Sequence, residues 1–111
     1  PDGALWFTEA YNGSKIGRIT TSGRVTEFSN STLSLEAYND IAAGPDGAMW
    51  FTEVSNVYAT PKVARISMRG KITQYTKDLP AQAGLSGIVA GPDGNVWFVD
   101  SLNDKTGRVR L

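Results

Sequence analysis

Polar and apolar residues follow one another in short alternating runs along the whole chain. The runs are rich in Val, Ile, Thr and aromatic side chains, and Gly, Pro, Asp or Asn stand between them. This pattern is typical of β-strands joined by turns, and the spacing of an amphipathic helix is sustained nowhere. The chain is therefore expected to be all-β.

Three elements of the sequence recur. A Pro-Asp-Gly turn followed by a Trp-Phe strand occupies residues 1–9, 45–53 and 92–100. A strand with Lys at its start and Arg near its end follows at residues 15–19, 62–66 and 105–109, and a Gly-containing turn with a further strand follows at residues 22–28 and 69–75. Four antiparallel strands repeated every ~40 to 50 residues are typical of the blades of a β-propeller.

The middle copy shows the strands of one complete repeat. Asp46-Gly47 lies between two apolar runs, and glycine accepts the positive φ that a tight hairpin turn requires. Trp50 and Phe51 are adjacent and must point to opposite faces of one sheet, so both faces need cover, as in stacked blades. The predicted strands are residues 41–44, 48–53, 62–67 and 71–76.

The repeats divide the chain into about two and a half blades of one propeller domain. We expect a partial blade at 1–28 without its innermost strand, a complete blade at 41–76, and a partial blade at 88–111 without its outermost strand. Propellers close with roughly four to eight blades, so this is an incomplete ring. Because an open arc exposes apolar faces and strand edges, we expect remaining blades or self-association to close it.

Composition narrows the chemistry that the chain can perform. Eleven Lys and Arg balance eleven Asp and Glu, which gives no electrostatic argument for nucleic acid, and no apolar run reaches the ~18 to 20 residues of a membrane span. The chain has neither His nor Cys, which excludes a Ser-His-Asp triad, a cysteine nucleophile and metal sites built on imidazole or thiolate. Proton transfer would have to use carboxylates, Lys or Tyr.

Polar residues gather where the topology predicts the long loops. In an up-and-down blade, the loops after the second strands and the connections between blades emerge at the same end. These residues either face a small-molecule substrate or a hard cation and act as acid and base, or they cap loops and pair with nearby lysines. The candidates are Glu9, Glu53 and Asp100 at the ends of second strands, and Asn39, Asp40 and Ser86 before innermost strands.

The repeat resembles a known family. Residues 41–53, followed by Lys-Val-Ala-Arg-Ile and Gly-Lys-Ile-Thr, are similar to the blade repeat of the virginiamycin B lyase family, and the similarity extends over essentially the whole chain. The resemblance implies a seven-bladed propeller that, with Mg²⁺, confers antibiotic resistance by opening the macrocyclic ester of streptogramin B through elimination.

The family's reactive residues map onto this chain only in part. The resemblance implies a glutamate at the end of the Trp-Phe-Thr-Glu strand, which Glu53 matches, as Glu9 does in the first copy. It also implies a histidine at the start of an innermost strand, where this chain has Asn39 and Ser86. Glu53 is thus the catalytic candidate. The parent protein is expected to be a lyase, or alternatively a non-catalytic module that binds a ligand or protein or assembles with itself.

Overall fold

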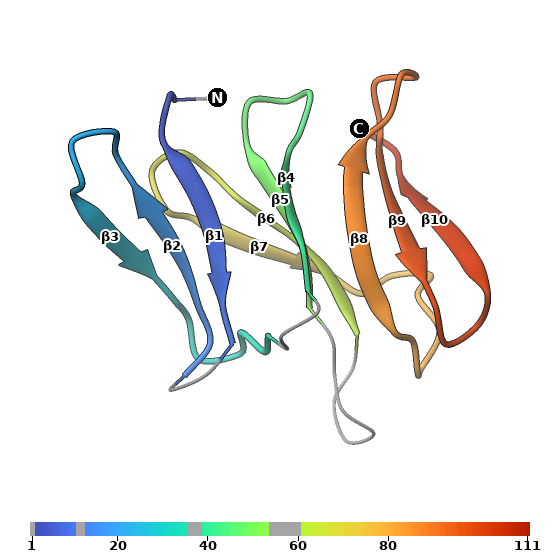
Figure 1. The fold of residues 1–111 in the computed structure, drawn as a ribbon. Helices are drawn as coiled ribbons and strands as arrows, with labels where there is room; N and C mark the ends of the chain where they lie inside the picture. Colours follow the sequence, from blue (N-terminus) through green and yellow to red (C-terminus); the bar gives the residue numbers. More distant parts are fainter. Residues whose placement is uncertain (1, 11–12, 36–38, 54–60) are drawn as a thin grey trace.

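The computed structural model describes residues 2–10, 13–35, 39–53 and 61–111 (Figure 1). These ranges contain ten strands and no helix, so the prediction of an all-β fold is confirmed. The structure accordingly contains, in the ranges described, no helix long and apolar enough to cross a membrane. The strands are β1 (Leu5–Glu9), β2 (Lys15–Ile19), β3 (Val25–Phe28), β4 (Ile41–Ala43), β5 (Met49–Glu53), β6 (Lys62–Ile66), β7 (Ile72–Tyr75), β8 (Leu85–Ala90), β9 (Val96–Asp100) and β10 (Lys105–Val109).

The strands form three antiparallel sheets that lie side by side like the blades of a propeller (Figure 1). The middle sheet has the order β4-β5-β6-β7, and the outer sheets have the orders β1-β2-β3 and β10-β9-β8. The described residues do not close into a ring. All four strands predicted for the middle repeat are present, each within a residue of its expected ends.

The third sheet starts earlier than the sequence pattern indicates. The alternating pattern places its first strand from residue 88, whereas β8 begins at Leu85. The pairing of β8 with β9 shifts register between Leu85 and Ile88. An irregularity of this kind leaves residues unpaired and interrupts the alternation of side chains, which is why the pattern conceals it.

Adjacent Trp and Phe side chains supply two separate cores. One core contains Phe51 of the middle sheet together with Trp6 and Ile16 of the first sheet. The other contains Trp50 on the opposite face, together with Phe98 of the third sheet. The prediction that both faces of the middle sheet are covered is therefore confirmed.

The end sheets bury one face each against the middle sheet and leave apolar side chains exposed on their free surfaces. Leu5 of the first sheet is 73% exposed, and Val89 of the third is 59% exposed. Exposed apolar surface of this kind is typical of an interaction face. The expectation that further blades or further copies cover these sheets remains a prediction.

The two ends of the sheets differ in their connections. Tight turns lie at one end, where Gly47 and Gly94 have φ of 81° and 79°, as the hairpin prediction requires. At the opposite end, β1, β5 and β9 finish, and β4 and β8 begin (Figure 1). We call this the loop-rich end. It gathers the candidate residues of the sequence in one part of the fold.

Candidate functional site

Glu53 lies buried at the end of β5, with only 1% of its surface exposed. Its Oε1 accepts a hydrogen bond from the backbone N–H of Ser34 at 2.8 Å, and its Oε2 accepts one from Nε2 of Gln74 at 2.7 Å. Burial raises the pKa of Glu53, while these two donors and the charge of Lys62 act in the opposite direction. The carboxyl group therefore ties the connection before β4 to the outermost strand β7.

Asp100 has the corresponding place at the end of β9. Its Oδ1 accepts from the backbone N–H of Gly84 at 3.1 Å, and its Oδ2 accepts from Nδ2 of Asn103 at 2.7 Å. Burial tends to raise the pKa of Asp100, but the hydrogen bonds from Asn103 and Gly84 outweigh it and lower the pKa. Like Glu53, this carboxylate holds an incoming connection against its sheet.

Glu9 ends β1 in a different environment. Glu27 pairs with Gly17 in the first sheet at the position where Gln74 pairs with Ala64 in the middle sheet. Glu9 therefore faces the carboxyl group of Glu27, whereas Glu53 faces the amide of Gln74. Hydrogen bonding with Glu27 is the largest cause that raises the pKa of Glu9. Burial and repulsion between the two charges raise this pKa further, whereas the charge of Lys15 lowers it. Within the described ranges, Oε2 of Glu9 is buried without a hydrogen-bond partner.

The remaining candidates link neighbouring innermost strands. Nδ2 of the buried Asn39 donates to the carbonyl of Leu85 at 3.0 Å, and Oγ1 of Thr52 donates to the carbonyl of Ser86 at 2.8 Å. Oδ2 of Asp40 accepts from the backbone N–H of Ile88 at 3.4 Å. The positions where the family resemblance implies histidine are thus occupied by residues that join the middle sheet to the third.

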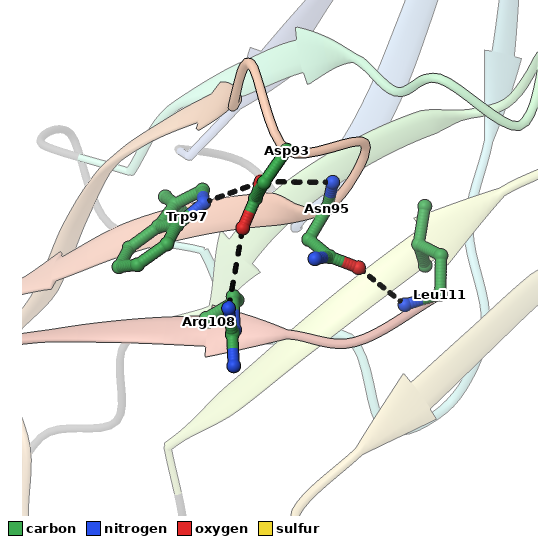
Figure 2. Close-up of polar contacts among 5 residues, drawn as sticks. All are labelled: Asp93, Asn95, Trp97, Arg108 and Leu111. Carbon is green, nitrogen blue, oxygen red and sulfur yellow. Dashed lines mark hydrogen bonds and ion pairs between the residues drawn. The ribbon is translucent and has the colours of Figure 1, made fainter.

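An Asp-Trp-Arg cluster recurs at the end of the sheets where the tight turns lie, opposite the loop-rich end. The sequence analysis did not identify this cluster. Oδ1 of Asp93 accepts from Nε1 of Trp97 at 3.0 Å, and Oδ2 accepts from Nη1 of Arg108 at 3.2 Å (Figure 2). Asp46 binds Trp50 and Arg65 in the same way, and Asp2 binds Trp6 and Arg18. Each of the regularly placed arginines thus pairs with the aspartate of its own turn. The fixed Asp-to-Trp spacing was the signal that could have identified the cluster.

These clusters hold the pKa of each aspartate below its ordinary value. For Asp2 the hydrogen bond from Arg18 is the main cause, and for Asp93 it is the hydrogen bond from Trp97. Burial works to raise the pKa of Asp46, but the hydrogen bonds from Arg65 and Trp50 outweigh it. The charged form of each carboxyl is thus favoured in the folded state.

We expect the free energy of unfolding to fall as the pH is lowered from about 5 toward 2. A carboxyl whose pKa is lower in the folded state stabilises the fold above its unfolded pKa of about 3.9, and this contribution is lost as the pH falls through the folded pKa. Urea unfolding at several pH values measures the effect. Asp46→Asn should reduce the slope, because this variant lacks the carboxyl whose pKa is lowered. An unchanged slope in Asp46→Asn would contradict the assignment.

The carboxylates do not form a ligand set for the Mg²⁺ that the resemblance implies. Hard divalent cations take several oxygen ligands at one point. In the part of the chain that the structure describes, no three His, Cys, Asp or Glu side chains are grouped so that they could hold a metal ion. The oxygens of Glu53 and Asp100 instead accept hydrogen bonds from nearby amides. These residues therefore do not fit a metal centre.

Comparison with known protein families supports the resemblance that the sequence repeat indicates. The family model described as the virginiamycin B lyase family matches residues 1–111. Searches of the curated proteins and of the solved structures gave no significant match.

Proposed function

Since the chain belongs to the virginiamycin B lyase family over residues 1–111, we propose that it forms one arc of a β-propeller whose closed ring opens a cyclic ester. The substrate class is a small molecule of the streptogramin B type. The observation that carries the proposal is the family match along the whole chain, supported by three blade-like sheets. Further blades, encoded in a longer chain or supplied by other copies, complete the ring.

The proposed reaction is an elimination. A base removes the acidic proton from the carbon next to a carbonyl, and the electron pair of that C–H bond forms a carbon–carbon double bond. The bond between the neighbouring carbon and the ester oxygen breaks, and the released carboxylate keeps the electron pair of that bond. No water is consumed, so the opened product has the same mass as the cyclic substrate. A base and a general acid are required in positions that reach the substrate.

Within this proposal, the described residues build the scaffold of the loop-rich end. Both oxygens of Glu53 are engaged by Ser34 and Gln74, and the buried Asn39 is bonded to the third sheet. A residue held in this way positions loops rather than exchanging protons with a ligand. The acid and base of the reaction then come from other blades, as do the ligands of any Mg²⁺ that the reaction uses.

A second candidate role for Glu53 follows from its raised pKa. A carboxyl that keeps its proton to higher pH is suited to act as a general acid. Glu53 also occupies the strand-end position that the family uses for its reactive glutamate. In this alternative, the ring closed by further blades would bring the substrate to the Glu53 carboxyl.

A different class of function is a non-catalytic propeller that binds a ligand or a protein at the loop-rich end. The observation favouring it is chemical: the chain has no histidine, and the described candidate carboxylates serve structural contacts. In that case the complete protein would bind a cyclic ester, or another molecule, without changing it.

Ring opening by the full reading frame that encodes this chain tests these roles. The assay follows loss of a streptogramin B-type cyclic ester in the presence of Mg²⁺, for the natural protein and for Glu53→Gln. If Glu53 is scaffold, the variant keeps its rate within about threefold, because the amide oxygen still accepts from Ser34. If Glu53 transfers a proton, the rate falls about 10²- to 10⁴-fold.

Two further variants serve as controls for the assay of Glu53→Gln. Glu53→Ala removes the acceptor of two hydrogen bonds and should lower the free energy of unfolding by about 1 to 3 kcal/mol, which separates folding from chemistry. Glu27→Gln alters the exposed carboxyl beside Glu9 and should leave the rate unchanged. Failure of the natural protein to open the ring would contradict the lyase proposal and favour the binding module.

A further inference from the structure

Charged side chains are distributed unevenly between the two ends of the sheets. The turns that join β2 to β3, β4 to β5, β6 to β7 and β8 to β9 lie opposite the loop-rich end, and we call this the tight-turn end (Figure 1). Among the described residues, its basic side chains are Arg18, Arg24, Arg65, Arg69, Lys71, Arg108 and Arg110, and its acidic side chains are Asp2, Asp46 and Asp93. The tight-turn end therefore has a surplus of four positive charges.

The loop-rich end has the opposite balance. The described charged residues there are the bases Lys15, Lys62, Lys77 and Lys105 and the acids Glu9, Glu27, Asp40, Glu53, Asp78, Asp100 and Asp104. Because the two ends nearly cancel, the neutral total charge of the chain conceals one basic end and one acidic end. A separation of this kind orients a protein in the field of a charged partner.

The acids of the tight-turn end are already paired. Each of its three aspartates binds one arginine of an Asp-Trp-Arg cluster, at 2.7 to 3.2 Å. The other four basic residues of this end are exposed, and none of them forms an ion pair with a described residue. These four residues are Arg24, Arg69, Lys71 and Arg110. Their charges are therefore available to an external partner.

Two turns hold these charges at fixed positions of the backbone. The backbone N–H of Arg24 donates to Oγ1 of Thr20 at 3.1 Å, and that of Lys71 donates to Oγ of Ser67 at 3.1 Å. The glycine directly before each of these basic residues has φ of 90°, a conformation that glycine adopts without strain. Arg24 and Lys71 thus stand at equivalent places in two turns of the same build, each directly before an outermost strand.

No long loop projects from the tight-turn end. Five residues separate the strands in each of its four turns, which are residues 20–24, 44–48, 67–71 and 91–95. Short turns of equal length form a broad face rather than a groove. Duplex DNA is read by a helix or a β-ribbon that enters a groove, whereas an anionic bilayer attracts basic side chains spread over a broad face. The shape of this end therefore favours a lipid surface over nucleic acid.

We propose that the tight-turn end is an electrostatic docking face for an anionic lipid bilayer, with Arg24, Arg69 and Lys71 in contact with the phosphate-bearing headgroups. In this orientation, the acidic loop-rich end lies away from the bilayer and stays open to ligands from solution. The inference rests on the placement of charges at the two ends of the sheets and is independent of the proposed lyase activity.

Lipid vesicles test the docking face on the protein made from the full reading frame that encodes this chain. Co-sedimentation compares vesicles of pure phosphatidylcholine with vesicles in which one third of the lipid is phosphatidylglycerol. We expect binding to the anionic vesicles alone, and we expect added salt to weaken it, because salt screens exposed charges. Inorganic phosphate should weaken binding no more than chloride does at the same ionic strength, because a single ion cannot engage several turns at once.

Single substitutions identify the end that docks. Arg24→Gln, Arg69→Gln and Lys71→Gln should each lower the partition coefficient about fivefold, since one basic side chain near an anionic bilayer contributes about 1 kcal/mol. Lys77→Gln and Lys105→Gln change exposed lysines of the loop-rich end and should leave the partition coefficient nearly unchanged. Circular dichroism confirms that each variant is folded.

Three results would overturn the proposal. The first is equal binding to the two kinds of vesicle, and the second is an equal loss of binding in the variants of the two ends. The third is tighter binding to duplex DNA than to the anionic vesicles, with the same three tight-turn substitutions weakening it, which would assign the face to nucleic acid instead.

Discussion

Replacing Trp50 by alanine should lower the free energy of unfolding by about 3 to 5 kcal/mol, the range typical of large buried aromatic side chains. Trp50 is 2% exposed and packs in the core shared by the middle and third sheets. Its ring stacks on Tyr75, and its Nε1 donates to Asp46 at 3.0 Å. The substitution therefore leaves a cavity and removes a donor from a carboxylate. Urea unfolding followed by fluorescence and circular dichroism measures the loss.

Trp97→Ala is the matched comparison for Trp50→Ala. Trp97 makes the same bond to its turn aspartate, but it is half-buried and lacks a stacked ring within the described ranges. Because less packing is lost, this variant should be destabilised less than Trp50→Ala. A loss below about 1 kcal/mol at Trp50 would show that Trp50 is not packed between two sheets.

Gly44→Ala is expected to be destabilising by about 3 kcal/mol, at the upper end of the range for overpacking. A Cβ atom at this position would lie 2.3 Å from Cδ1 of Trp50 and 2.8 Å from Oδ1 of Asp46. Neither neighbour can move freely, because the indole is buried and the carboxylate holds both Trp50 and Arg65. The added methyl group must therefore disturb the cluster that anchors the turn. Thermal and urea unfolding of the variant measure this effect.

Gly87→Ala provides the control for Gly44→Ala. The nearest atom to a Cβ at position 87 is Cγ2 of Val99 at 3.9 Å, an ordinary van der Waals contact. This substitution should change the free energy of unfolding by less than about 0.5 kcal/mol. If Gly44→Ala had the same free energy of unfolding as the natural chain, the turn would not approach the indole ring of Trp50 closely.

Most of the fold could be predicted from the repeat because local patterns determine it. The alternation of side chains located the strands, Gly47 and Gly94 identified tight turns, and adjacent Trp50 and Phe51 required cover on both faces. Each of these inferences depends on the residue and its immediate neighbours. The early start of β8 at Leu85 was not predictable in this way, because an irregular pairing interrupts the alternation.

The contacts of the candidate site depended on residues far apart in the sequence. The sequence places Glu53 at a strand end, but its bonds to Ser34 and Gln74 arise from the path of a connection and from the register of β7. Likewise, the place of Asp46 in a tight turn can be predicted from its immediate neighbours. Its ion pair with Arg65 cannot, because that contact depends on the pairing of β5 with β6. The catalytic role of Glu53 remains a prediction.

The mass of the product is the most direct test of the central claim that this chain is an arc of an ester-opening lyase. The full reading frame is incubated with a streptogramin B-type cyclic ester and Mg²⁺, and the product is analysed by mass spectrometry and fragmentation. We predict a linear product with the same mass as the substrate and a new carbon–carbon double bond. A linear product heavier by one water, or an intact ring after prolonged incubation, would contradict the account.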